Sequence, residues 1–178
     1  MSVTWKDIVK DWEKLPLETY KFLFSQAKDR FDEVISESVS ITDKSINLTK
    51  VAIAALTGFV GYNFKVNPGL EWIVLLSFFF LIDLICLAVL MFPKGVVFKG
   101  SPPEEIFCDY LDNPSYTEDE KTTIVYYHEL RRYQERIEKM NKKNSCRHIF
   151  YGVALITTIL LTVLTAGVII STIFSHHP

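Results

Sequence analysis

Three apolar stretches constrain the fold of this chain more than any other feature. They run over residues 46–64, 70–91 and 149–174. A bilayer core is about 30 Å thick, so an α-helix needs about 20 residues to cross it. The second and third stretches have this length, and the first has it only if Lys50 extends its ammonium group to the headgroups. Because lipid offers no hydrogen bonds to the backbone, each stretch is predicted to be a transmembrane helix.

The positive charges predict how these spans are oriented. Lysine and arginine are concentrated before the first span and between the second and third. The loop after the first span holds only Lys65, and neither residue type follows the third span. The positive-inside rule therefore predicts a cytoplasmic N-terminus, an external C-terminus and two large cytoplasmic segments. The formal net charge of -2 points to no partner by itself.

The cytoplasmic segments carry two helical patterns. In each segment a seam of mainly apolar residues recurs at alternating spacings of three and four. The first seam consists of Leu17, Tyr20, Phe24, Ala27, Phe31, Val34, Ser38, Ile41, Ser45 and Leu48, and the second of Tyr126, Leu130, Tyr133, Ile137, Met140 and Asn144. This spacing is typical of helices that pack side by side. Thr117 and Glu120 form a capping box, which predicts that the second of these helices begins there. We expect a cytoplasmic stalk of two long helices that continue into the first and third spans.

The predicted fold class is an all-α membrane protein with three transmembrane helices, a heptad-patterned stalk and an oligomeric bundle. The chain divides into four predicted parts. They are cytoplasmic amphipathic and heptad helices (1–45), a transmembrane hairpin (46–92), a cytoplasmic insert with a long helix (93–148), and the third span with a short tail (149–178). Turn signals fill the insert, where we expect a short helix over residues 103–112.

Asp83 is the most unusual residue of the spans. It lies deep in the second span, where a charged carboxylate costs a few kcal/mol unless it meets a partner or water. Lys50 is one candidate partner, and the other structural interpretation is a protonated Asp83 that forms a hydrogen bond with a threonine or serine of a neighbouring helix. The functional alternative places Asp83 and Lys50 in a pore or gate.

The third span carries a stripe of hydroxyl groups within about 40° of one line on a helical wheel. Its members are Thr158, Thr162, Thr165 and Thr172, and Tyr151 extends the line toward the cytoplasm. Aligned hydroxyls suit a water-filled path in an oligomer. They equally suit contacts between helices. Both interpretations stay open from the sequence.

The cytoplasmic helix before the third span carries a basic stripe. Its candidate ligand residues are Arg132, Arg136, Lys139 and Lys143. Arginine binds phosphate in a bidentate manner, so a phosphate-bearing ligand is one interpretation. For the residues nearest the membrane, from Lys142 to Arg147, contact with anionic lipid headgroups is the simpler interpretation.

Enzyme and metal chemistry have no motif in this sequence. The three cysteines form no CxxC and have no histidine at ligand spacing, and no phosphate-binding loop, nucleophile elbow or HExxH is present. We therefore expect no catalytic residues, no metal and no cofactor.

The order of elements resembles a known group of proteins. The residues that carry the likeness are Thr42-Asp43-Lys44-Ser45 before the hairpin, and Tyr133 and Ile137 followed by Asn141-Lys142-Lys143 before the final span. With the layout of residues 36–174, they resemble small transmembrane effectors of bacterial antiphage systems. These include the Pycsar membrane effectors, their relatives in cyclic-oligonucleotide signalling and the membrane component of the Hailong system.

The resemblance implies a homo-oligomer, with a tetramer favoured, in the bacterial inner membrane. It also implies a nucleotide or oligonucleotide signal from a neighbouring nucleotidyltransferase or cyclase, and abortive infection by permeabilising the membrane. The expected function is thus a gated ion-conducting pore in antiphage defence. The alternative is a non-conducting scaffold or anchor whose cytoplasmic helices recruit a partner protein.

Overall fold

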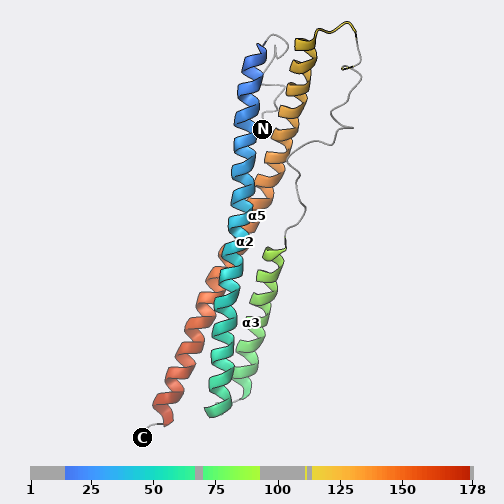
Figure 1. Cartoon of the computed structure of the whole chain (residues 1–178). Helices are drawn as coiled ribbons and strands as arrows, with labels where there is room; N and C mark the ends of the chain where they lie inside the picture. Colours follow the sequence, from blue (N-terminus) through green and yellow to red (C-terminus); the bar gives the residue numbers. More distant parts are fainter. Residues whose placement is uncertain (1–14, 67–69, 93–110, 112–113, 177–178) are drawn as a thin grey trace. The chain divides into compact units, whose positions relative to one another are not determined.

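The computed structural model describes residues 15–66, 70–92, 111 and 114–176. These residues form three α-helices and no strand (Figure 1). Helix α2 spans Leu17–Val66, α3 spans Leu70–Met91, and α5 spans Glu118–His176. The all-helical prediction is confirmed for this part of the chain. The predicted N-terminal amphipathic helix and, apart from Leu111, the short helix at 103–112 lie outside the described residues.

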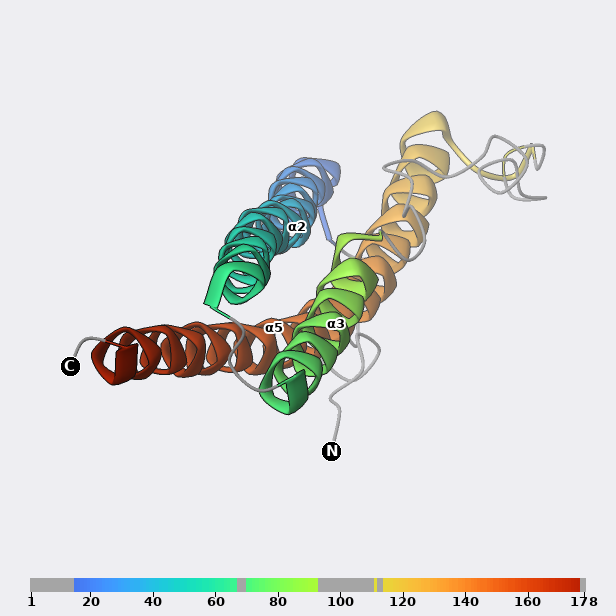
Figure 2. The ribbon, with the colours of Figure 1, turned by 90° about the horizontal axis from the view of Figure 1, so that it is seen from below.

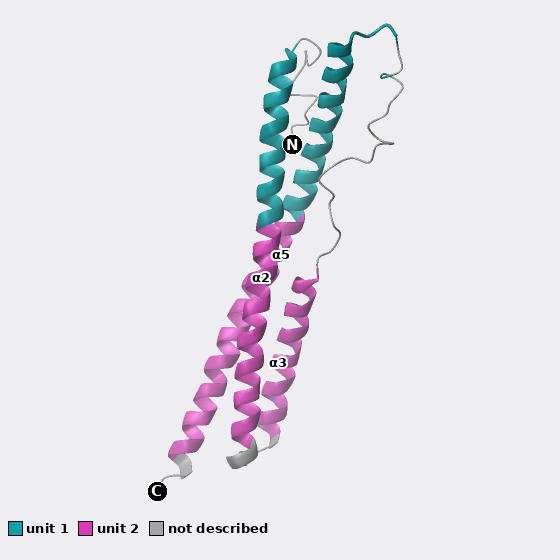
Figure 3. Cartoon of the chain, viewed as in Figure 1, with its two compact units in different colours: residues 1–36, 95–142 teal, residues 37–94, 143–178 magenta. Residues whose placement is uncertain are grey.

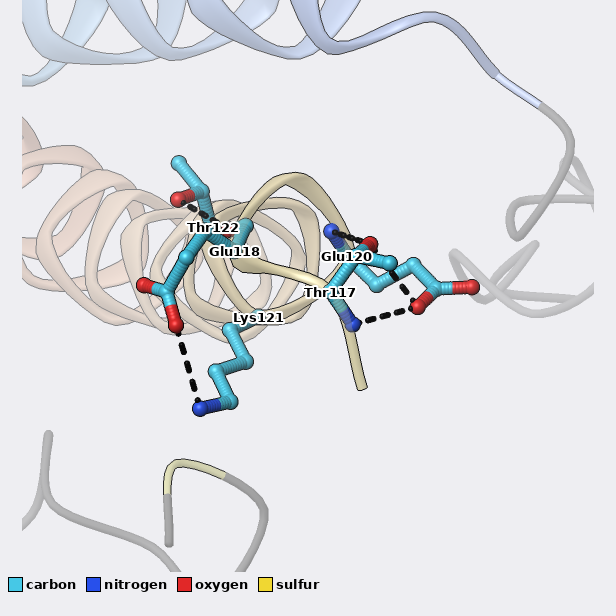
Figure 4. Close-up of polar contacts among 5 residues, drawn as sticks. All are labelled: Thr117, Glu118, Glu120, Lys121 and Thr122. Atoms are coloured by element: carbon cyan, nitrogen blue, oxygen red, sulfur yellow. Dashed lines mark hydrogen bonds and ion pairs between the residues drawn. The ribbon is translucent and has the colours of Figure 1, made fainter. Parts of the chain in front are cut away.

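The start of α5 confirms the predicted capping box. The Thr117 amide donates to Glu120 Oε2 over 2.8 Å, and the Glu120 amide donates to Thr117 Oγ1 over 3.3 Å (Figure 4). These contacts satisfy two backbone donors that the first turn of a helix leaves without partners. The hydrogen bonds from the backbone and side chain of Thr117 also lower the pKa of Glu120 from its ordinary value.

The chain forms two compact units (Figure 3). Unit 1 contains Met1–Ser36 and Gly95–Lys142, and unit 2 contains Glu37–Lys94 and Lys143–Pro178. Helices α2 and α5 contribute their first parts to unit 1 and their remaining parts to unit 2, whereas α3 belongs to unit 2 alone. Both long helices are continuous, which confirms the expectation that each cytoplasmic helix continues into the apolar stretch after it.

Unit 1 has an interior of aromatic and aliphatic side chains. The buried residues are Tyr20, Phe31 and Val34 on α2, and Tyr127, Leu130, Tyr133, Ile137 and Met140 on α5. The ring of Tyr133 meets those of Phe24 and Phe31 edge-on, with centroids 5.4 and 5.5 Å apart. This arrangement is favourable for aromatic pairs. The three buried α2 residues all belong to the predicted seam. On α5 one residue differs from the prediction: Tyr127 is buried, whereas its neighbour Tyr126, the predicted seam residue, is half-buried.

Unit 2 is a bundle of three helical segments (Figure 2). Near one end, Leu48 and Ala52 of α2 pack with Leu87 of α3 and Ala154 of α5. Further along the bundle, Phe59 packs with Phe80 of α3. Residue numbers rise along α2 as they fall along α3, so these two helices are antiparallel. In each of the three helices the residues of these clusters form a buried side, and the opposite side is exposed.

Two of the three helices are long and apolar enough to cross a membrane. They are α3, over Ile73–Met91, and α5, whose apolar part follows Arg147. The first predicted span lies in α2, and no segment of α2 within the described residues reaches that apolarity. Lys50, Tyr62 and Asn63 account for the difference, because each replaces an apolar side chain in the stretch.

Candidate functional site

The carboxylate of Asp83 is held between α3 and α5. Its side chain is only 4% exposed. Thr157 Oγ1 donates to Oδ1 over 2.6 Å, and Thr158 Oγ1 donates to Oδ2 over 2.6 Å. Short bonds of this kind are typical of hydroxyl donors to carboxylates. The cluster of Asp83, Thr157 and Thr158, which we name the acid clamp, joins α3 and α5. Asp83 and Thr158 are buried, and Thr157 is exposed.

The acid clamp has competing acceptors on α5. Thr157 Oγ1 lies 2.9 Å from the Ala154 carbonyl, and Thr158 Oγ1 lies 2.8 Å from the same oxygen. Each hydroxyl has one proton to donate. Donation to Asp83 therefore gives up a bond to the helix backbone, and the hydroxyls have an alternative partner whenever α5 moves away from α3.

Lys50 is not the partner of Asp83. Its ammonium group donates to Asn47 Oδ1 of its own helix over 3.3 Å, and the side chain is exposed. Among the described residues, no lysine, arginine or histidine pairs with Asp83. The predicted Lys50–Asp83 pair is thus wrong, and the alternative of threonine partners on a neighbouring helix is the arrangement present.

The threonine stripe of α5 points mainly into unit 2. Thr158 and Thr165 are buried, while Thr162 and Thr172 are half-buried. Thr162 donates to the Thr158 carbonyl, Thr165 to the Thr162 carbonyl and Thr172 to the Val168 carbonyl, at 2.7–2.8 Å. Tyr151 is half-buried against the cluster of Leu48 and Leu87. In a single chain this stripe therefore contacts helices and its own backbone.

Thr157, Ser45 and Asn63 of unit 2 were not among the predicted site residues. Ser45 and Asn63 are buried, whereas Thr157 is exposed. Thr157 was missed although it is adjacent to Thr158 in the sequence. Ser45 is fully buried and donates to the Ile41 carbonyl over 2.8 Å. Asn63 is 2% exposed and donates to the Phe59 carbonyl over 2.8 Å, while its side-chain oxygen has no partner in the chain. An asparagine inside an apolar stretch is the signal that marks this last position.

Arg147 joins all three helices of unit 2. Its guanidinium donates to the Ser38 carbonyl (3.1 Å), Ser38 Oγ (2.6 Å), Thr42 Oγ1 (2.7 Å) and the Leu90 carbonyl (2.8 Å). Leu90 lies in the last turn of α3, where carbonyl groups lack partners within the helix and favour a positive charge. The planar fork of arginine allows this number of bonds.

A second polar group lies beside Arg147 on α5. His148 Nε2 is 2.8 Å from Glu37 Oε1, and Asn144 Nδ2 donates to Glu37 Oε2 over 3.3 Å. Both contacts connect α5 to α2. Together with Arg147 they form a polar collar (Glu37, Ser38, Thr42, Asn144, Arg147, His148) at the expected cytoplasmic end of the spans.

The predicted basic stripe is divided between the units. Arg132, Arg136 and Lys139 belong to unit 1, and Lys143 belongs to unit 2. Arg132 pairs with Glu129 over 2.9 Å, and the Arg136 guanidinium lies 5.8 Å from the centre of the Tyr133 ring. Two of the four residues are thus engaged within unit 1, and phosphate binding by this stripe stays a prediction.

No group of three or more metal-ligating side chains is present among the described residues. No protein family, curated protein or solved structure matches this chain. The likeness to antiphage effectors therefore rests on layout and short motifs alone, and the functional argument depends on the geometry of the acid clamp and the polar collar.

Proposed function

We propose that this chain is a multi-pass protein of the bacterial inner membrane, with its N-terminus in the cytoplasm, that conducts ions through a gated homo-oligomer. In this proposal α2 supplies a third transmembrane segment, since its residues 48–63 pack alongside α3 and α5. A tetramer is the favoured assembly. The chain would act as an effector of antiphage defence that stops growth of the infected cell.

One observation carries the proposal: a carboxylate without a cationic partner is held in the middle of the spans. Asp83 is eight residues from Met91, which corresponds to about 12 Å along α3. A simple membrane anchor has no need of such a residue, because intramembrane acids are expensive and are usually functional.

The acid clamp corresponds to a closed state. While Thr157 and Thr158 hold the carboxylate, Asp83 is covered by α5. Separation of α5 from α3 would expose the acid and return both hydroxyls to the Ala154 carbonyl. An exposed carboxylate beside a water-filled path attracts cations. We therefore expect the open state to favour cations over anions.

The proposed signal is a nucleotide or oligonucleotide made by a neighbouring nucleotidyltransferase or cyclase. Unit 1 is the proposed receiver, with Lys139 and the neighbouring arginines as ligand candidates. The two long helices pass from unit 1 into unit 2 without interruption. A ligand that changes the packing of α2 and α5 in unit 1 thus acts on the same two helices that enclose the spans.

The test is a current recording from purified protein in planar bilayers, with and without a nucleotide extract from cells carrying the neighbouring gene. We expect discrete currents whose preference for cations falls in Asp83→Asn. Thr172→Val is the matched control, because its hydroxyl bonds only to its own helix. Bilayers that stay silent under both conditions, or currents unchanged in Asp83→Asn, would contradict the proposal.

The second candidate is the scaffold or anchor, and one observation favours it. Asp83 and the threonine hydroxyls all have partners within a single chain, so none of them needs water. A scaffold predicts that Asp83→Asn and Thr162→Val leave defence intact, while charge reversal on unit 1 abolishes it. A phage-protection assay with these variants separates the two candidates.

A further inference from the structure

The exposed side of α2 in unit 2 differs from those of its two neighbours. The exposed Ile46, Val51 and Ile53 lie at the flanks of this side. Its middle consists of Asp43, Asn47, Lys50, Ala54, Thr57, Gly58 and Gly61, which we name the α2 outward face. At 3.6 residues per turn they lie on the side opposite the buried Ala52 and Phe59. The face is therefore charged at one end and small or polar along the rest.

The exposed sides of α3 and α5 are large and apolar instead. Phe78 on α3 is 57% exposed, and Ile156 and Val163 on α5 are each 65% exposed. Such side chains are suited to lipid tails. A face with an exposed lysine, asparagine and threonine is not, because polar groups in lipid require partners. Since α2 lies alongside two spans, its outward face needs a different neighbour.

The α2 outward face carries an acidic and a basic side chain, so that two copies of it would offer each other opposite charges. Asp43 forms no ion pair within the described residues, and the one partner of Lys50 is the Asn47 amide oxygen. The two residues are seven positions apart, about 10 Å along the helix. In parallel copies around an axis, the flexible lysine of one copy extends toward the aspartate of the next.

The two glycines allow a second helix to come close. A Cβ atom added at Gly58 or Gly61 meets nothing within 4 Å in the chain. Small residues at such positions allow helix backbones to approach in membranes. Within one chain, therefore, nothing requires glycine at either position.

We propose that a second copy of this chain packs on the α2 outward face, so that α2 is the helix that joins the copies. The threonine stripe of α5 then remains inside each copy. The inference rests on the proposed function, because it names the helix that builds the conducting assembly.

Cysteine cross-linking in native membranes tests the contact. In a background with Cys86, Cys108 and Cys146 replaced by serine, we expect disulfide-linked dimers for Ala54→Cys and Gly61→Cys. Val74→Cys on α3 and Val163→Cys on α5 are controls of equal exposure class, and they should stay monomeric. A product of twice the chain mass supports a second copy. A product of another mass indicates a different protein on this face and overturns the proposal.

A second test places a bulky side chain on the α2 outward face. Gly58→Leu should abolish the oligomer in lipid nanodiscs, whereas Gly167→Leu, an equally open glycine on α5, should leave it intact.

Cross-links at Val163 or Val74 without any at Ala54, or exclusively monomeric protein, overturn the inference. Cross-links at Ala54 in a protein that never conducts support it while the proposed function fails. Currents that persist in Gly58→Leu overturn the proposed contact through α2, while the proposed conducting function stands.

Discussion

The two units, which Figure 3 shows in different colours, differ in the side chains that they expose and in how many polar side chains they bury. Among the described residues of unit 1 the buried ones are aromatic or aliphatic. The ion pair of Arg131 and Glu135 is exposed, and that of Arg132 and Glu129 is half-buried. In unit 2 the outside carries Phe78, Ile156 and their neighbours, while six polar residues are buried. These are Ser45, Asn63, Asp83, Asn144, Thr158 and Thr165.

The difference indicates which force stabilises each unit. Burial of apolar surface in water is favourable by about 25 cal/mol per Å², and this accounts for the core of unit 1. We propose that unit 2 lies in a membrane, and in lipid that driving force between helices is absent, so association would depend on close packing and on hydrogen bonds between helices. The acid clamp and Arg147 provide such bonds in unit 2.

The largest effect is expected in the core of unit 1. Phe31 is fully buried, so Phe31→Ala should reduce the free energy of unfolding by about 3–5 kcal/mol. Phe22, on the same helix and 63% exposed, is the control, and its replacement by Ala should cost less than about 0.5 kcal/mol. Denaturant unfolding of the full chain in micelles, with hydrogen exchange to locate the change, measures both. Equal losses would contradict an apolar core in unit 1.

The next effect is expected at Arg147. Arg147→Ala removes four hydrogen bonds from a charged donor and should cost about 3 kcal/mol in unit 2. Arg147→Lys keeps the charge without the fork and should lose part of this. The exposed Lys44→Ala is the control for loss of charge alone. Unfolding in mixed micelles gives the values, and an Arg147→Ala variant as stable as Lys44→Ala would show that the collar does not hold the helices together.

A smaller effect is expected for the acid clamp. Thr158→Val keeps the shape of the side chain and removes one donor to Asp83, so it should cost about 1 kcal/mol, as hydrogen bonds between membrane helices typically do. Thr172→Val should be close to neutral, because Thr172 donates to the backbone of its own helix. The same unfolding assay measures the pair, and an identical cost for both would place the stabilisation outside the clamp.

The smallest effect concerns pH and unit 1. Burial, followed by the charges of Arg132 and Arg131, lowers the pKa of His128 from 6.5, with Glu129 acting in the opposite direction. The folded state therefore binds fewer protons than the unfolded state below that value. The neutral His128 therefore contributes fully to the stability of the folded state above pH 6.5, and this contribution is lost as the pH falls through the pKa of His128 in the folded state. Unfolding between about pH 7 and pH 5 should show this slope. In His128→Gln the slope should be shallower, and an unchanged slope would assign it to other groups.

The sequence predicted helices better than it predicted their partners. The capping box at Thr117 and the seam residues Phe31 and Tyr133 follow local rules of helix chemistry and periodicity, and the structure confirms them. Lys50 failed as the partner of Asp83 because proximity between helices depends on their rotation about their own axes, which apolar stretches do not encode. Arg147 was interpreted as a membrane-flanking charge, and its bonds to Ser38 and Leu90 require three segments to meet.

The sequence by itself therefore determined the helical class, the start of α5, the buried seam of unit 1 and the apolar stretches of α3 and α5, because each depends on residues close together in the chain. Only the tertiary structure decided which polar side chains of different helices meet. It placed Asp83 against two threonines of α5, and it left Asp43, Lys50 and Gly58 on the outside of α2. The physical reason is that in the spans polar side chains gain stability only from a specific neighbour, and that neighbour is set by how whole helices pack.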